Sequence, residues 1–248
     1  MIEREICSIG DFLAARQADA EHFPGAIWYR GHADAKWQLM PGYIRSQRTV
    51  SETTLMARFR QSAAMLTERL PNSEFDWLFL MQHYGVPTRL LDWSESPLVA
   101  LYFAVEPQIE SAKVDGALWC LNPHKLNKQA NIKSPDEEYY IPSFEDEEMA
   151  GYTPESVSRQ RRLELSPAAT IATRNNSRIQ AQSGTFTVHH SLIIPIEDIG
   201  DRNHVVKYFI PSERKSYLFD ELRSLGVNRF SLFPELASVG RILSESLS

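Results

Sequence analysis

The chain has 248 residues, a formal net charge of −6 and two cysteines. A chain of this length can bury about three quarters of its unfolded surface without a disulfide or a structural metal, and two distant cysteines exclude both a disulfide framework and a CxxC zinc or redox site. The acidic balance argues against a broad nucleic-acid-binding surface, and no apolar stretch approaches the roughly 18 residues of a membrane span. We therefore expect one cytoplasmic domain over residues 1–248, with no membrane partner.

The first third of the chain predicts two helices around a short strand. Residues 8–17 have apolar positions along one helical face, with Ser8 or equally Asp11 as the candidate N-cap. Residues 26–31 are rich in aromatic and β-branched side chains and predict a strand, with a short continuation over residues 36–39. Residues 51–70 hold good helix formers throughout and predict the longest helix.

A dense run of polar and core-type residues, QHYGVPTRLLDWSESPLVALYFA, occupies residues 82–104. The helix that precedes it ends at the Gly-Val-Pro sequence, which puts His83 and Tyr84 on its last turn. A Ser-Pro pair then caps a second helix. Residues 88–93 between the two helices must be extended, so they should hold their side chains in fixed positions.

The remainder predicts more strands and helices around a polar, acidic segment at 124–165, which we interpret as an insertion with one or two short helices. The predicted strands are 116–121, 185–188, 191–196 and 205–210, and the predicted helices are 212–225 and 231–244. Strands separated by helices and then clustered near the end indicate an α+β fold.

Arg30 lies at the end of a predicted strand, in the sequence WYRGH. The planar guanidinium can grip a phosphate or carboxylate with two hydrogen bonds, and the glycine beside it would let a ligand approach the backbone. The alternative is a structural salt bridge from Arg30 to an acid such as Asp92. His83 and Tyr84 have a similar alternative, because many helices end in a buried aromatic residue and a satisfied core histidine.

Other candidates also have structural alternatives. Arg89 and Asp92 can pair with each other, and Ser94 and Ser96 are typical N-cap residues. No GxSxG sequence surrounds either serine, and the chain has no P-loop, HExxH or GxGxxG motif.

A third constellation is RIQAQSGTFTVHH, residues 178–190. If this segment is extended, Gln180 and Gln182 share one face, because side chains alternate with period two. Two amides on one face can fix a ribose or an amide-bearing ring through paired donors and acceptors. The alternative is two solvated glutamines at a strand edge.

Together these stretches resemble the FRG domain family, whose name refers to an aromatic-Arg-Gly tripeptide, here Tyr29-Arg30-Gly31. The passage 82–104, the sequence RIQAQSGTF and the sequence LFPELASVG at residues 232–240 also resemble blocks of that family. The resemblance spans about residues 27–240.

A more distant resemblance is to ADP-ribosyltransferases of the Arg-Ser-Glu class. In that class an aromatic-Arg-Gly strand is followed by a Ser-rich strand that leads into a Ser-Pro-x-x-Ala-x-x-Phe helix, and then by a Glu-x-Glu strand. Here Arg30, the segment from Ser96 to Phe103, and Gln180-x-Gln182 take these places. The resemblance implies an α+β fold with a split mixed sheet and flanking helices, NAD as substrate and no metal.

The same resemblance implies the site residues. The catalytic set is Arg30, Tyr84, Asp92, Ser94 and Gln182, and the cofactor-binding set is Tyr29, Arg30, Gly31, His83, Arg89 and Gln180. Gln182 stands where the class has a glutamate, and a neutral amide cannot offset the positive charge of an oxocarbenium-like transition state. Asp92 is the first candidate for the missing acid.

The expected function is cleavage of the nicotinamide–ribose bond of NAD, in a toxin or anti-phage effector with a macromolecular acceptor or a neutralising partner protein. The alternative is a nucleotide-sensing or protein-interaction module that uses the same pocket without turnover. A third alternative, processing of nucleic acid, is not favoured because of the acidic balance.

Overall fold

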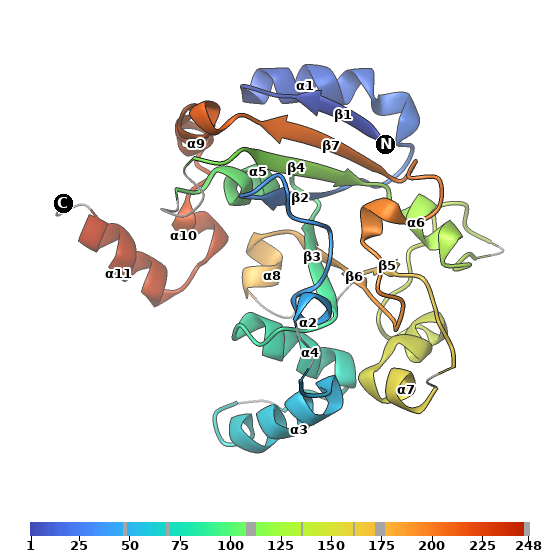
Figure 1. The fold of residues 1–248 in the computed structure, drawn as a ribbon. Coiled ribbons are helices and arrows are strands. Elements are labelled where there is room, and N and C mark those ends of the chain that lie inside the picture. Colours follow the sequence, from blue (N-terminus) through green and yellow to red (C-terminus); the bar gives the residue numbers. More distant parts are fainter. Residues whose placement is uncertain are drawn as a thin grey trace.

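The computed structural model describes residues 1–46, 49–67, 70–107, 113–134, 136–160, 162–171 and 177–245. The chain forms an α+β fold with one seven-stranded mixed sheet and flanking helices (Figure 1). The strands are β1 (Ile2–Glu5), β2 (Trp28–His32), β3 (Leu90–Ser94), β4 (Gly116–Leu121), β5 (Ala168–Thr170), β6 (Gly184–Val188) and β7 (Val205–Ile210). Their order across the sheet is β1-β7-β4-β2-β3-β6-β5, in which β1 runs parallel to β7 and all other neighbouring strands are antiparallel. The predicted fold class is therefore confirmed.

Helices pack on the sheet through separate core clusters. The α-helices are α1 (Ile9–Ala18), α2 (Gly42–Arg45), α3 (Glu52–Ala63), α4 (Glu74–His83), α5 (Pro97–Val105), α6 (Pro123–Gln129), α7 (Pro154–Arg159), α8 (Ser177–Ala181), α9 (Lys215–Ser224), α10 (Arg229–Leu232) and α11 (Leu236–Glu245). Helices α1, α5 and α9 belong to one cluster and α6 to another, and α3, α4 and α7 lie at the lower end of the view in Figure 1. The 3-10 helices are η1 (Ala20–His22), η2 (Glu147–Tyr152), η3 (Ile196–Asp198) and η4 (Ser212–Arg214). No helix in the described ranges is both long enough and apolar enough to span a bilayer.

The sheet is divided between β2 and β3. These neighbours are in register only where Tyr29 faces Ser94, whereas β2 pairs with β4 along its whole length. In Figure 1, β1, β7, β4 and β2 form the upper part of the sheet, and β3, β6 and β5 run away from it below. Because the two parts diverge, space opens beside the last residues of β2. The likeness to the ADP-ribosyltransferase fold stays a prediction.

Helix α5 packs directly against β2, and buried residues of both elements belong to one hydrophobic core cluster. A Cβ atom on Gly31 would lie 1.9 Å from the carbonyl oxygen of Ala100 and 2.6 Å from the amide nitrogen of Ala104. Strand and helix backbones can therefore approach this closely only because residue 31 has no side chain. Helix α5 fills the side on which a Gly31 side chain would point, but Gly31 itself also lines the cavity described below. The expectation that a ligand approaches the backbone at Gly31 stays a prediction.

Several predicted elements differ from the structure. Helix α3 ends at Ala63, before the predicted end at residue 70, and residues 68–69 lie outside the described part. Residues 36–39 and 191–195 form turns and irregular chain instead of strands. In the second of these segments the chain folds back, and the His189 ring contacts the carbonyl oxygen of Ile194 at 3.1 Å. The predicted helix over 231–244 is divided into α10 and α11, because Pro234 cannot continue a helix.

The segment 124–165 is joined to the core in its described parts. The Asn127 side chain forms two hydrogen bonds with the backbone of Ala169, at 2.7 and 3.0 Å, and so fixes α6 to β5. Tyr152 is 1 % exposed and donates to the carbonyl oxygen of Ser166 at 2.7 Å. The described parts of this polar, acidic segment therefore also contribute buried side chains to the fold.

Candidate functional site

A cavity of about 670 Å³ opens where the sheet divides, between the ends of β2 and β3 and the helices α4, α5 and α8. Its volume is within the range of small-molecule pockets. Polar and aromatic side chains line it together: Tyr29, Arg30, Trp37, Asn72, Asp76, Phe79, Gln82, His83, Asp92, Trp93, Ser94, Phe103, Arg178, Gln182 and Phe186. Residues from distant parts of the sequence thus meet at one place.

Arg30 is half-buried at this cavity and is held by two neutral acceptors. Its Nε donates to Nε2 of His32 at 3.1 Å, and its Nη1 donates to the backbone carbonyl oxygen of Asp92 at 2.6 Å. Burial, opposed in part by the Asp92 carboxylate, lowers the pKa of Arg30, but a guanidinium keeps its proton in proteins. Within the described residues no carboxylate forms an ion pair with Arg30. The alternative of a structural salt bridge to Asp92 is therefore wrong.

Asp92 is the exposed member of β3, whose other residues are buried. Its side chain lines the cavity, and no side chain in the described ranges hydrogen-bonds or ion-pairs with its carboxylate. Its charge interacts with that of Arg30 through space. The cavity thus offers a fixed cation and an unengaged carboxylate.

Ser94 and Gln182 line the same cavity, but each side chain is engaged in structural hydrogen bonds. The Ser94 hydroxyl donates to the carbonyl oxygen of Gln182 at 2.6 Å and accepts from the amide of Ser96 at 2.9 Å. The side-chain amide of Gln182 donates to the carbonyl oxygen of Leu232 at 3.2 Å, which ties it to α10. Both residues therefore stabilise the wall of the cavity.

The prediction that Gln180 and Gln182 share the face of a strand is wrong. Gln180 belongs to the short helix α8, is exposed and does not line the cavity. Gln182 follows the end of that helix, and Ser183 then takes a positive φ of 46° that turns the chain into β6. The amide of Gln182 still donates to the carbonyl oxygen of Arg178, so the helical turn continues to this residue. Residues i and i+2 of such a turn point in nearly opposite directions, and only the Gln182 side chain lines the cavity.

The last turn of α4 separates the two residues predicted there. His83 lines the cavity, and burial together with the charge of Arg178 lowers its pKa. Tyr84 is the C-cap residue, is 68 % exposed and lies outside the cavity lining, so its catalytic assignment is corrected. Neighbouring residues on a helix are about 100° apart, which is why one faces the site and the next faces solvent.

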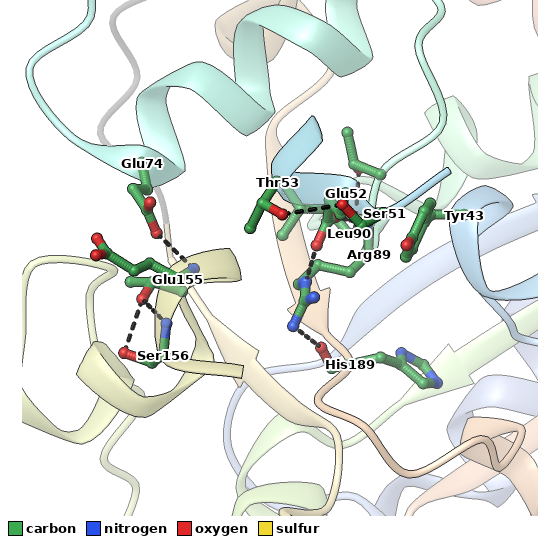
Figure 2. A network of polar contacts seen from close by, with 12 residues as sticks. Tyr43, Ser51, Glu52, Thr53, Glu74, Arg89, Leu90, Glu155, Ser156 and His189 are labelled. Carbon is green, nitrogen blue, oxygen red and sulfur yellow. Dashed lines mark hydrogen bonds and ion pairs between the residues drawn. The ribbon is translucent and has the colours of Figure 1, made fainter. Parts of the chain in front are cut away.

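Arg89 is also corrected, because it forms a buried ion pair away from the cavity (Figure 2). Its Nε contacts the carboxylate of Glu52, and its backbone amide donates to the same carboxylate at 3.0 Å. Its Nη1 reaches the carbonyl oxygen of His189 at 3.4 Å. The side chains of Arg89 and Glu52 are 5 % and 3 % exposed, so this pair fixes α3 to the start of β3, and Arg89 is not among the residues that line the cavity.

The cavity contains residues that the sequence reasoning did not select. Arg178 adds a second cation and lies over the Phe233 ring at 4.7 Å. Asp76 closes a capping box with Ser73 at the start of α4 while it also lines the cavity. A helical interpretation of residues 177–181 would have singled out Arg178, whereas no sequence signal pointed to Asp76. No group of His, Cys, Asp and Glu in the described residues could hold a metal ion.

The FRG domain family model matches residues 25–113. The match supports the FRG family for the segment from β2 to α5, which supplies Arg30, His83 and Asp92 to the cavity. The stretches at 178–186 and 232–240 that resemble the same family lie outside the residues that the FRG model matches. No curated protein and no solved structure matches the chain.

Two buried histidines are expected to make the free energy of unfolding depend on pH: His32, next to the tripeptide Tyr29-Arg30-Gly31, and His190, which is near the charge of Arg89. Burial above all, and then the neighbouring arginine, lowers the pKa of His32 to about 3 and that of His190 to about 4. Below the ordinary pKa of 6.5 these two imidazoles bind protons in the unfolded chain but stay neutral in the folded chain, which favours unfolding. We expect this stability to be complete above pH 6.5 and to fall by about 1 kcal/mol per pH unit for each histidine as the pH drops toward 4.

Urea denaturation at pH 7 and pH 5 measures this effect, with His190→Gln as the comparison. The variant should show a shallower dependence on pH than the wild type, because glutamine does not titrate. Equal slopes in the two proteins would contradict a neutral His190 in the folded state.

Proposed function

We propose that the cavity binds an NAD-type dinucleotide and that the protein cleaves its nicotinamide–ribose bond, as an ADP-ribosyltransferase or an NAD glycohydrolase. One observation carries this proposal: the Arg30 guanidinium and the free carboxylate of Asp92 open onto one cavity that also has aromatic walls. Phosphate needs the cation, a ring needs the aromatic walls, and cleavage needs a negative charge near the ribose.

Arg30 is suited to hold the phosphates. Its Nε and one Nη1 proton are bound by the protein, which orients the plane of the guanidinium. The remaining protons of Nη1 and Nη2 have no acceptor within the described residues, so a phosphate can take them in a paired geometry. Phe79, Phe103 and Phe186 then offer apolar surfaces for a base or a nicotinamide ring.

Asp92 is the group in this cavity suited to replace the missing glutamate. When the bond between ribose and nicotinamide breaks, its electron pair leaves on the nicotinamide nitrogen and the ribose becomes positively charged. A carboxylate without a protein partner can stabilise that charge, whereas the amide of Gln182 is neutral and already engaged. Water or an acceptor group then attacks the ribose and releases a proton.

Arg30→Gln is expected to weaken NAD binding with little loss of stability, because glutamine keeps a polar side chain but removes the charge. A charge-assisted hydrogen bond contributes about 1.5–3 kcal/mol, so the affinity should fall by tenfold or more. Isothermal titration with NAD and ADP-ribose measures the affinity, and thermal denaturation controls for folding. If Arg30→Gln unfolds the protein instead, Arg30 is a structural residue.

Nicotinamide release from labelled NAD tests the chemical step. Asp92→Asn should lower the rate by roughly a hundredfold, as expected when one electrostatic contact to the transition state is lost. Asp220→Asn, an exposed substitution on α9 far in sequence from the cavity lining, should leave the rate unchanged. If neither free nicotinamide nor a labelled acceptor is detected in host lysate, that result contradicts an enzyme of this class.

The engaged side chains of Ser94 and Gln182 favour a second candidate, a nucleotide-sensing module that binds without turnover. Such a module would be stabilised by NAD or ADP-ribose by about 2.7 kcal/mol at 100 times the dissociation constant. A thermal shift without any product distinguishes this candidate from the enzyme.

A further inference from the structure

His32 lies beneath Arg30 and connects it to the backbone of the next loop. Arg30 and His32 are two residues apart on β2, so their side chains lie on the same face of the strand. The Arg30 Nε donates to Nε2 of His32 at 3.1 Å, and Nδ1 of His32 lies 3.2 Å from the carbonyl oxygen of Trp37. The histidine therefore has a hydrogen-bond partner on each ring nitrogen.

The partners determine the protonation of the ring. A guanidinium has only donors, so Nε2 of His32 must be the acceptor and carry no proton. The proton then lies on Nδ1, where it donates to the carbonyl oxygen of Trp37. Burial and the Arg30 charge lower the pKa of His32 to about 3, which keeps this neutral form over the ordinary pH range.

Packing against neighbouring rings also restricts the orientation of the His32 ring. His32 is 3 % exposed and lies edge-on to the Trp37 and Trp119 rings, at centroid distances of 5.9 and 6.4 Å. Trp37 also lines the cavity. A ring held in this way presents its acceptor in one direction only.

We propose that His32 is a positioning residue, whose neutral ring fixes the Arg30 guanidinium so that its unbound N–H groups are directed to a phosphate in the cavity. This role rests on the proposed nucleotide site. It extends the Arg-Gly sequence to Arg-Gly-His as one functional unit: Gly31 admits the helix, and His32 orients the cation.

Two variants separate positioning from packing. His32→Phe keeps a ring but removes the acceptor, whereas His32→Gln offers a side-chain carbonyl in its place. We expect His32→Phe to weaken ADP-ribose binding by roughly tenfold and His32→Gln to restore part of the affinity. His204→Phe is the matched control: His204 is a buried histidine bonded to the carbonyl oxygen of Ile196 at 2.7 Å, outside the cavity lining, and its replacement should leave the affinity unchanged.

Nitrogen NMR tests the proposal without any ligand. In the wild type we expect an unprotonated Nε2 and a protonated Nδ1 on His32, and a slowly exchanging Arg30 Nε–H that disappears in His32→Phe. A protonated Nε2 in the wild type would overturn the proposal even if the variant fails to fold, and so would an unchanged Arg30 signal and affinity in a folded His32→Phe. Wild-type protein that binds neither NAD nor ADP-ribose, but shows these signals, would instead contradict only the nucleotide site.

Discussion

Gly31→Ala is expected to reduce the free energy of unfolding by about 3 kcal/mol or more, enough to unfold much of the protein. The added Cβ would lie 1.9 Å from the carbonyl oxygen of Ala100 and 2.6 Å from the amide nitrogen of Ala104. Both are backbone atoms of α5, so no side-chain rotation can relieve the clash. The helix must separate from β2, which also moves Arg30 away from the cavity.

Urea denaturation followed by circular dichroism measures this loss, with Gly10→Ala as the matched control. Gly10 lies inside α1, and a Cβ there would meet nothing nearer than the Ser8 hydroxyl at 3.6 Å. The control should be neutral or stabilising by up to about 1 kcal/mol, because alanine is the better helix former. A Gly31→Ala protein as stable as the wild type would contradict the close packing of β2 against α5.

Elements with a strong local signal could be predicted from the sequence. Of the two candidate caps of α1, Ser8 is the N-cap, and its hydroxyl accepts a hydrogen bond from the amide of Asp11. Strands β4 and β7 have the predicted boundaries, because apolar runs bounded by Gly, Asn and Pro are distinctive. Helix α5 begins at Pro97 for the same kind of reason.

Elements that depend on distant partners could not be predicted. Strand β1 has the sequence IERE, and only its pairing with β7 makes it a strand. The segment 177–181 was expected to be extended but forms a helix, because its Ile179 packs against Gly184 and closes a tight turn into β6. Such pairings are decided by tertiary contacts, which override the local pattern.

The candidate site was predictable in part for the same reason. A polar residue within a strand, such as Arg30 in β2 or Asp92 in β3, projects from fixed backbone, and both reach the cavity. The partner of Arg89 could not be found in this way, since Glu52 lies on α3, 37 residues earlier in the sequence. A charge next to a site residue in sequence can thus belong to the core of the fold.

The ion pair between Arg89 and Glu52 makes Glu52→Gln the second substitution with a large expected effect. Glu52 is in the first turn of α3, after the Ser51 N-cap, where a negative charge is favourable. Its carboxylate accepts from both the backbone amide and the side chain of Arg89 (Figure 2). Glutamine would keep one acceptor but leave a buried guanidinium without its counter-charge. We expect a loss of about 3–5 kcal/mol in the free energy of unfolding, measured by urea denaturation.

Glu155→Gln is the matched control, because it also removes a glutamate from an ion pair. The Glu155 and Arg159 side chains are 53 % and 76 % exposed, so this substitution should cost less than about 0.5 kcal/mol. Replacing Glu52 and Arg89 together by leucine should recover most of the loss, since removing both charges leaves neither one buried and unpaired. Because Arg89 does not line the cavity, the folded fraction of Glu52→Gln should bind ADP-ribose with the wild-type affinity. Similar small losses of unfolding free energy in Glu52→Gln and Glu155→Gln would contradict a buried ion pair between Arg89 and Glu52. Weakened ADP-ribose binding by folded Glu52→Gln would indicate that Arg89 contributes to the site.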